Sequence, residues 1–267
     1  MNKKIIICYH FTKFDNHKQL INFIKYYRKY PPGISHKLLI CFKLIHIKKI
    51  ARLRYLLKNI DYIEFVDPNL LNDFDFGSYK RVSKLYPSYR ILFLNSHSYP
   101  NCPMWLKKID VHFKDKTIIG TSSSNESILT SLKIKKFYKI FSYVKKLLKY
   151  KKKFNPFPNP HIRTSSFYIM GSDLLSFLDK KFFLSKEDAW YAESGTNGLT
   201  NFFKNKKYNI LIINSDGEKF TEKKWKLSET FNYMSQTKSL ISDKHTRKYL
   251  KLSVKQRLIF ERNTWGE

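Results

Sequence analysis

The chain has 267 residues, of which 51 are Lys or Arg and 21 are Asp or Glu, so its formal net charge is +30. Apolar residues make up 42% of the chain and aromatic residues 16%, which is enough for a sizeable core and excludes a wholly disordered protein. No run of 18 uncharged apolar residues occurs, which argues against a membrane-spanning helix.

Part of the positive charge reflects composition, because Lys, Asn, Ile, Phe and Tyr are abundant while Ala is rare, as in a low-GC genome. A strongly positive field nevertheless attracts phosphates, nucleotide diphosphates and anionic membrane surfaces. Charge alone is also compatible with a basic nucleic-acid-binding module. No RNP, KH, zinc-finger or helix-turn-helix pattern supports that alternative, so we expect no nucleic-acid partner.

The first residues, MNKKIIICYH, predict a buried strand rather than a signal peptide, because the apolar run is short and lacks a small-residue cleavage site. The three cysteines, Cys8, Cys41 and Cys102, have no CxxC spacing, so we expect reduced thiols in a reducing compartment. Together these features predict a cytoplasmic protein.

Short apolar runs alternate with segments of helical periodicity along the chain. Strands are predicted at 3–10, 37–45, 61–66, 90–94, 117–120, 162–170 and 210–213. Helices are predicted at 19–30, 47–59, 77–85, 132–154, 173–178 and 199–206, followed by a basic helical C-terminal part. This alternation favours one α/β domain over 1–267 with a largely parallel central sheet flanked by helices.

Small polar residues follow the strand predicted at 90–94, namely Asn95, Ser96, His97 and Ser98. Ligands of open α/β sheets bind at the carboxyl ends of strands, which makes these residues candidates for binding. The alternative is a plain turn, since Asn, Ser and Pro are turn residues.

A second polar stretch, KEDAWYAESGTNGLT at 186–200, leads into the helix predicted from residue 199. Exposed N–H groups near Ser194 and Gly195 would favour an anion there, and glycine permits close approach. The alternative is an ordinary capped helix with Thr196 or Asn197 as the N-cap.

Six segments in chain order resemble bacterial glycosyltransferases of the rhamnosyltransferase and polysaccharide-biosynthesis kind: FDFGSYKRV, ILFLNSHSYP, IIGTSS, PHIRTSSFYIM, ESGTNGLTNFF and NSDGEKF. The resemblance covers the whole chain and is to enzymes similar to the GT-A, family 2 type. It implies a GT-A-like domain with a nucleotide-binding half at about 1–130 and an acceptor half at about 160–267. The implied reaction is inverting hexosyl transfer from a nucleotide-sugar to a surface glycan, such as lipopolysaccharide, or to a lipid-linked acceptor.

The resemblance also implies roles for individual residues. The segment from Glu193 through LTNFFKNKKYNILII resembles the acidic pattern that supplies the base in family 2 enzymes, with Ser194 in place of a second acid. Glu193 is therefore the first candidate for the base and Asp188 the second. The implied donor-binding residues are His10, Thr12, Asp67, Gly77, Lys80, Asn95, Ser96 and His97. The implied contacts to the acceptor or a phosphate come from His161, Arg163, Ser194 and Gly195.

Three of these assignments have plain alternatives. Asp67 either contacts the nucleotide base or ends its strand in an Asp-Pro turn. Arg163 either clamps a diphosphate bidentately or is a surface arginine. Asn95-Ser96-His97 stands where such enzymes carry an Asp-x-Asp motif for Mn or Mg, and no carboxylate is present. This departure leaves metal dependence open, and His97 is the side chain that could be a ligand. The alternative to an active enzyme is a non-catalytic glycosyltransferase-like scaffold.

The helix predicted at about 133–154 has apolar residues at 134, 137, 138, 141, 144, 147 and 148, and lysines fill most of its other positions. One interpretation packs this stripe on the core and leaves the lysines in solvent. The other is an interfacial helix that holds the protein on the anionic inner face of the cell membrane, near a lipid-linked acceptor.

Overall fold

The computed structural model describes residues 4–133 and 140–266. Its strands are β1 (Ile5–Thr12), β2 (Lys37–Lys43), β3 (Ile63–Val66), β4 (Arg90–Leu94), β5 (Tyr99–Pro100), β6 (Thr117–Gly120), β7 (Ser123–Ser124), β8 (His161–Ile162), β9 (Ser166–Met170), β10 (Asn209–Ile213), β11 (Lys219–Phe220) and β12 (Ile241–Ser242). Its helices are α1 (His17–Lys29), α2 (Ile47–Leu57), α3 (Phe74–Leu85), α4 (Trp105–Asp110), α5 (Ile140–Lys153), α6 (Gly171–Leu178), α7 (Lys186–Ser194), α8 (Leu199–Asn205), the 3-10 helix η2 (Glu222–Ser228), α9 (Lys244–Leu250) and α10 (Val254–Trp265).

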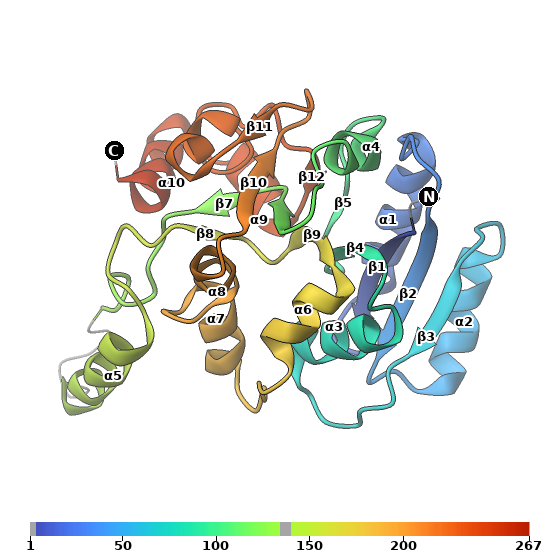
Figure 1. The fold of residues 1–267 in the computed structure, drawn as a ribbon, viewed down its shortest axis with the longest axis horizontal. Coiled ribbons are helices and arrows are strands. Elements are labelled where there is room, and N and C mark those ends of the chain that lie inside the picture. Colours follow the sequence, from blue (N-terminus) through green and yellow to red (C-terminus); the bar gives the residue numbers. More distant parts are fainter. Residues whose placement is uncertain (1–3, 134–139, 267) are drawn as a thin grey trace.

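Eight of the strands form one sheet in the order β11-β10-β6-β9-β4-β1-β2-β3 (Figure 1). Strands β3, β2, β1 and β4 are parallel neighbours, and β6 is parallel to β10. Strand β9 runs antiparallel between β4 and β6, and β11 is antiparallel to β10. The predicted α/β class with a mostly parallel central sheet is confirmed.

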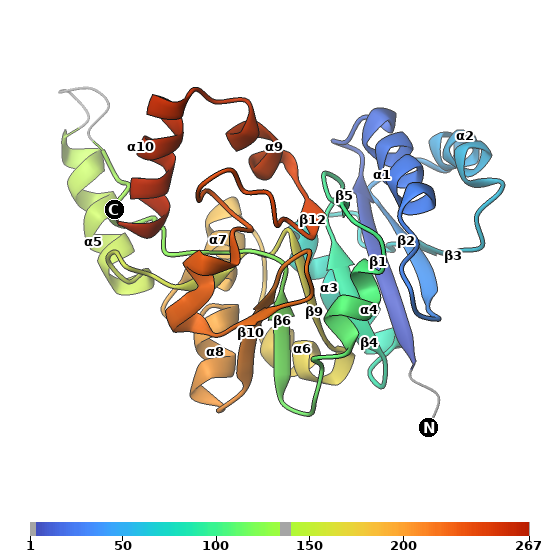
Figure 2. The same cartoon turned by 90° about the horizontal axis from the view of Figure 1, so that it is seen from above.

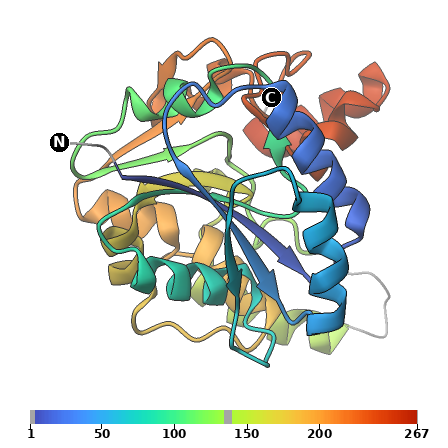
Figure 3. The same ribbon diagram turned by 90° about the vertical axis from the view of Figure 1, so that its right-hand side faces the viewer.

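Strand β1 shows how the sheet separates two apolar layers. Alternate residues point to opposite faces of a strand, so Ile7 and Tyr9 join the cluster under α1, α2 and α4, while Ile6 and Cys8 join the cluster under α3, α6 and α8. Figure 3 shows α1 and α2 on one side of the sheet and α3 on the other. The near-continuous apolar runs read from the sequence arise because both faces of the sheet are covered.

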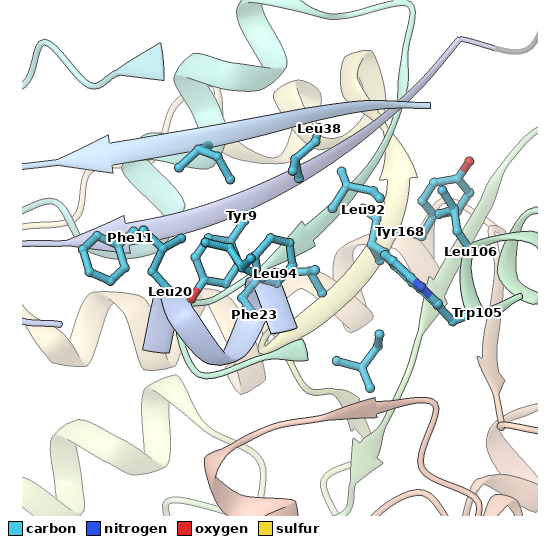
Figure 4. Close-up of a cluster of buried hydrophobic side chains, with 14 of the residues drawn as sticks. Tyr9, Phe11, Leu20, Phe23, Leu38, Leu92, Leu94, Trp105, Leu106 and Tyr168 are labelled. Carbon is cyan, nitrogen blue, oxygen red and sulfur yellow. The ribbon is translucent and has the colours of Figure 1, made fainter. Parts of the chain in front are cut away.

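The cluster under α1 and α4 is built around large aromatic side chains (Figure 4). The rings of Tyr9 and Phe23 stack with centroids 4.0 Å apart, and Trp105 is completely buried beside them. The Tyr9 hydroxyl donates to the carbonyl of Ser96 at 2.7 Å. The core therefore positions the loop that follows β4.

The strand predicted at 162–170 is two strands in the structure. Strand β8 pairs with β7, whereas β9 pairs with β4 and β6, and residues 163–165 leave the sheet between them. The carbonyl of Ser165 accepts a hydrogen bond from the backbone N–H of Asn95 at 3.1 Å. Apolar periodicity did not reveal this break, because the pairing partners that separate the two strands are distant in sequence.

The order of strands creates a topological switch point between β1 and β4. The chain runs from β1 outward to β2 and β3, and it returns to the other side of β1 as β4. Ligands of open α/β sheets bind in the crevice at such a point, outside the carboxyl ends of the strands.

Candidate active site

The structure contains a cleft of about 1210 Å³, and residues from the crevice at the switch point form part of its wall. Asp75 of α3 and Asn95 after β4 contribute the part nearest the switch point, and Glu193 of α7 also lines the cleft. Much of the remaining wall comes from the 124–133 segment and from α5 and α10, which lie on the same side of the molecule in Figure 2. The volume is above the range of about 300–1,000 Å³ found for pockets that hold small ligands, so the cleft has room for two substrates.

Glu193 is oriented by the break between β8 and β9. Its Oε1 accepts hydrogen bonds from the backbone N–H of Thr164 at 2.8 Å and from the Thr164 hydroxyl at 2.9 Å. The next residue, Ser165, is bonded through its carbonyl to Asn95. Glu193 and Asn95 are 98 positions apart in the sequence, yet the two-residue span of Thr164 and Ser165 links them.

The residues after β4 form a tight hydrogen-bonded loop. The side-chain oxygen of Asn95 accepts from the N–H of His97 at 3.1 Å and from the hydroxyl of Ser98 at 2.8 Å. Ser96 donates to Asp15 at 2.7 Å, and Asp15 also accepts from the N–H and hydroxyl of Thr12, each at 2.8 Å. Asp15 thus joins the ends of β1 and β4.

This donor set does not fit a divalent cation. The Asn95 oxygen is already occupied by two donors, and Ser96 is bonded to Asp15. Burial lowers the pKa of His97, and Lys244 and Arg247 lower it further against the opposing effect of Asp15. Within 4–133 and 140–266, no group of three or more His, Cys, Asp or Glu residues is arranged to hold a metal ion.

Asp75 enters the cleft from the first turn of α3 and is held by a buried histidine. Its Oδ1 lies 3.2 Å from His10 Nδ1, and the other ring nitrogen of His10 lies 3.1 Å from the hydroxyl of Ser78. The Asp75 side chain is 47% exposed, whereas that of His10 is almost completely buried. His10 therefore supports the cleft wall from behind, and Asp75 presents the carboxylate.

Behind His10 lies a buried ionic cluster formed by Lys43, Asp67, Asp73 and Arg81. Arg81 bonds Asp67 at 2.6 Å and Asp73 at 2.7 Å, and Lys43 contacts both carboxylates. Burial raises the pKa of Asp73, but the bonds from Arg81 and Lys43 outweigh it and lower the pKa to about 2. The Asp67 carboxylate is completely buried in this cluster rather than open to the cleft.

Arg163 is also paired inside the protein. Its guanidinium bonds Asp243 at 2.7 Å and lies 3.7 Å from the centre of the Phe231 ring. Burial raises the pKa of Asp243, but the Arg163 charge and the N–H of Thr246 outweigh it and lower the pKa to about 2. Arg163 joins the segment after β8 to the N-terminus of α9, and it lines the cleft as a neutralised cation.

The other predicted residues have these positions. Asp188 caps the start of α7 through Ser185 and does not line the cleft. Lys80 bonds the carbonyl of Asp179 at the end of α6. Gly77 lies against Asp73, because a Cβ there would be 2.0 Å from the Asp73 carboxyl carbon.

At the end of α7, Ser194 lines the cleft and its carbonyl accepts from Asn159 at 2.7 Å, whereas Gly195 ends the helix outside the cleft. The N-cap of α8 is Gly198 rather than Thr196 or Asn197. His161 lines the cleft from β8, whereas Ser96 and His97 do not.

No protein-family model matches the chain, and no curated protein matches it. Among solved structures, it is similar to the glycosyltransferase GlyE of Streptococcus pneumoniae TIGR4, with 11% identity and a TM-score of 0.48 over 99% of this chain and 61% of that chain. It is also similar to the galactosyltransferase LgtC, with 12% identity and a TM-score of 0.41 over 79% of this chain and 73% of that chain. The chain is also similar to the bifunctional glycosyltransferase WbbM, with 12% identity and a TM-score of 0.41 over 70% of this chain and 37% of that chain. All three proteins are described as glycosyltransferases or, for LgtC, as a galactosyltransferase.

Several cleft residues were not selected from the sequence. Asp75 belongs to the FDFG segment, whose acidic residues stand out in a basic chain, and this signal could have found it. Thr164, Trp190 and Arg262 carry no comparable local signal. They reach the cleft only through the packing of α7 and α10 beside the break between β8 and β9.

Proposed function

We propose that the protein is a glycosyltransferase that uses a nucleotide-sugar donor, with Glu193 as the general base. The observation that carries this proposal is the position of Glu193. Its carboxylate is anchored through one oxygen by Thr164 and lines a large cleft that also reaches Asn95 at the switch point. Substrate-positioned carboxylates of this kind accept protons from attacking hydroxyl groups.

In the proposed reaction, the nucleotide diphosphate lies at the carboxyl ends of β1 and β4. Glu193 takes the proton from an acceptor hydroxyl as its oxygen forms the new bond to the anomeric carbon, and the bond to the diphosphate breaks with its electron pair on the leaving oxygen. The half-exposed Asp75 carboxylate is suited to accept hydrogen bonds from sugar hydroxyls. Attack opposite the leaving group would invert the anomeric centre, in line with the hexosyl transfer expected from the resemblance.

The acceptor is proposed to be a surface glycan or a lipid-linked glycan, with the enzyme attached to an anionic membrane through α5. The side chains of Phe141, Val144 and Leu148 on this helix are 86%, 45% and 57% exposed, and Tyr150 is the buried residue of α5. Leu147 of the stripe is partly buried, but three of its four described residues face solvent, which argues against packing on the core. Positions 134, 137 and 138 of the predicted stripe lie outside the described residues.

Lysines flank this exposed stripe, as expected for a helix that lies in the interface of an anionic membrane. Lys145 and Lys151 fall on either side of the line from Phe141 to Leu148 when α5 is drawn at 100° per residue. None of the described helices is long and apolar enough to cross a membrane. The proposed attachment is thus peripheral.

A panel of UDP-, GDP-, dTDP- and CMP-sugars tests the proposal through thermal-shift binding and hydrolysis of the donor. A bound donor stabilises the folded state by mass action, so the correct nucleotide-sugar should raise the melting temperature and be slowly hydrolysed. Binding without hydrolysis or transfer would support the scaffold alternative. Salt-sensitive binding to random oligonucleotides, with no response to any nucleotide-sugar, would support the nucleic-acid alternative.

A further inference from the structure

The part of the cleft contributed by the 124–133 segment, α5 and α10 carries three cationic side chains, Lys133, Lys146 and Arg262. Over 4–133 and 140–266, no carboxylate forms an ion pair with any of them. This separates them from Arg163, which lines the same cleft but is neutralised by Asp243. Glu126 is the acid in this part of the wall, and its Oε1 accepts a hydrogen bond from Thr264 at 3.1 Å. One acid against three cations leaves this part of the cleft positive.

A buried histidine in the same wall supplies a second, independent observation. His161 is only 8% exposed, and its Nδ1 donates to the carbonyl of Asn159 at 2.8 Å, since a carbonyl oxygen can only accept. The remaining ring nitrogen, Nε2, has no hydrogen-bond partner in the described part of the chain, although His161 lines the cleft. This nitrogen keeps access to the cleft rather than being sealed inside the protein, so it is open to a hydrogen bond with a bound ligand.

His161 and α10 are joined by short contacts. Strand β8 places His161 opposite Ser124, and the N–H of the next residue, Asn125, donates to the carbonyl of Thr264 at 3.1 Å. Arg262 is two residues before Thr264 on α10. From the other side, α5 turns Lys146 and Tyr150 toward the cleft, on the face opposite its exposed apolar stripe.

We propose that this end of the cleft binds a phosphate group of the acceptor, so that the acceptor is a sugar or glycan that carries a phosphate or is joined to its carrier through one. Arg262 and Lys146 supply the positive charge, and doubly protonated His161 donates a hydrogen bond through Nε2, because its Nδ1 already donates to Asn159. The proposal rests on the proposed glycosyltransferase function, because it names the chemical class of the second substrate. The partly exposed Trp190 in the same wall offers a flat apolar surface to the sugar rings.

The test is calorimetric titration of the whole chain with glucose 1-phosphate and, in parallel, with glucose. The expected result is measurable binding of the phosphate ester only. The double variant Lys146→Gln/Arg262→Gln should weaken this binding by at least about tenfold, because two charge-assisted contacts are removed. The matched control is Lys145→Gln/Lys152→Gln, which removes the same charge from the outer face of α5 and should change the affinity by less than about twofold. Melting temperatures of both variants report whether they remain folded.

Equal affinities of the wild type and the Lys146→Gln/Arg262→Gln variant would overturn the proposal, as would equal binding of glucose and its phosphate ester. Co-sedimentation with anionic phosphatidylglycerol vesicles distinguishes an acceptor phosphate from lipid headgroups. If the cleft variant loses vesicle binding as strongly as the outer-face variant, these cations serve the membrane and the proposal fails. The nucleotide-sugar panel separates the two proposals: donor binding without binding of glucose 1-phosphate refutes the acceptor site alone. The reverse result refutes the glycosyltransferase function, and with it the role of this site as an acceptor site, while a phosphate-binding site remains.

Discussion

The carboxylate of Glu193 is held by Thr164, which donates to the same oxygen through its backbone N–H at 2.8 Å and its hydroxyl at 2.9 Å. Both donors belong to the three residues that leave the sheet between β8 and β9. The arrangement fixes one carboxylate oxygen and leaves the other without a hydrogen-bond partner among the described residues. A base that must accept a proton in a fixed direction requires this combination of anchoring and access.

Replacing Glu193 with Gln should reduce glycosyl transfer by at least about 100-fold, because general-base catalysis typically contributes 10²–10⁴-fold. The amide preserves the shape and the bonds from Thr164, so the affinity for the donor should change little. Steady-state kinetics and donor titration measure the two quantities separately. If the variant keeps more than about a tenth of the activity, Glu193 is not the base.

Asp188→Ala provides the matched acid substitution on the same helix. Asp188 caps α7 through Ser185, so its loss should cost about 0.5–2 kcal/mol of stability while turnover of the folded protein is retained. Denaturant unfolding and kinetics at a temperature well below the melting point test this expectation. Loss of turnover in folded Asp188→Ala, together with activity in Glu193→Gln, would transfer the role of base to Asp188.

Gly77→Ala should destabilise the protein by about 1–3 kcal/mol through overpacking. A Cβ at residue 77 would lie 2.0–2.3 Å from the carboxyl group of Asp73, which is held by Lys43 and Arg81 and so cannot move away without breaking the ionic cluster. Urea unfolding measures the loss. The double variant Gly77→Ala/Asp73→Ser should lose less unfolding free energy than the sum of the losses in the two single variants, because the smaller side chain at 73 relieves the clash. Strictly additive losses would contradict this account.

Acid should weaken the contact between Arg163 and Asp243. The pKa of Asp243 is about 2 in the folded protein, below its ordinary value of 3.8, so the unfolded state binds the proton first. The resulting stabilisation, about 2 kcal/mol, is present above pH 4 and is lost as the pH falls toward 2. Denaturant unfolding at pH 5 and pH 3 measures the effect: the free energy of unfolding should fall less between these two pH values in Asp243→Asn than in the wild type. Equal losses would mean that this ion pair does not contribute to acid sensitivity.

Removing the exposed apolar stripe should release the protein from anionic membranes. Phe141→Ser/Leu148→Ser deletes apolar side chains that are already 86% and 57% exposed, so the fold should be retained while co-sedimentation with anionic vesicles falls. Replacing the outer-face lysines Lys145, Lys151 and Lys152 with Gln should have the same effect and should reduce the salt dependence, since each lysine near the surface contributes on the order of 1 kcal/mol. A wild-type protein that does not sediment at low salt would show that α5 has only a structural role.

The sequence by itself determined the α/β class, the order of most elements along the chain and a largely parallel sheet. The reason is local, because a strand covered on both faces is a continuous apolar run and a surface helix repeats its apolar residues every three or four positions. The strand end at Asn95 could be selected for the same reason, whereas Glu193 was selected through the resemblance of its segment to family 2 glycosyltransferases.

Only the tertiary structure decided which candidates share a cleft. Asp67 pairs with Arg81, 14 positions away, and Arg163 pairs with Asp243, 80 positions away, so their burial in ion pairs could not be read from local patterns. The apolar stripe of α5 illustrates the same limit: its spacing predicts a helix with an apolar face, but whether that face meets the core or the solvent depends on where the rest of the chain lies. Packing between distant segments sets the surroundings of a side chain, and those surroundings determine whether a charge is neutralised in the interior or presented to a ligand.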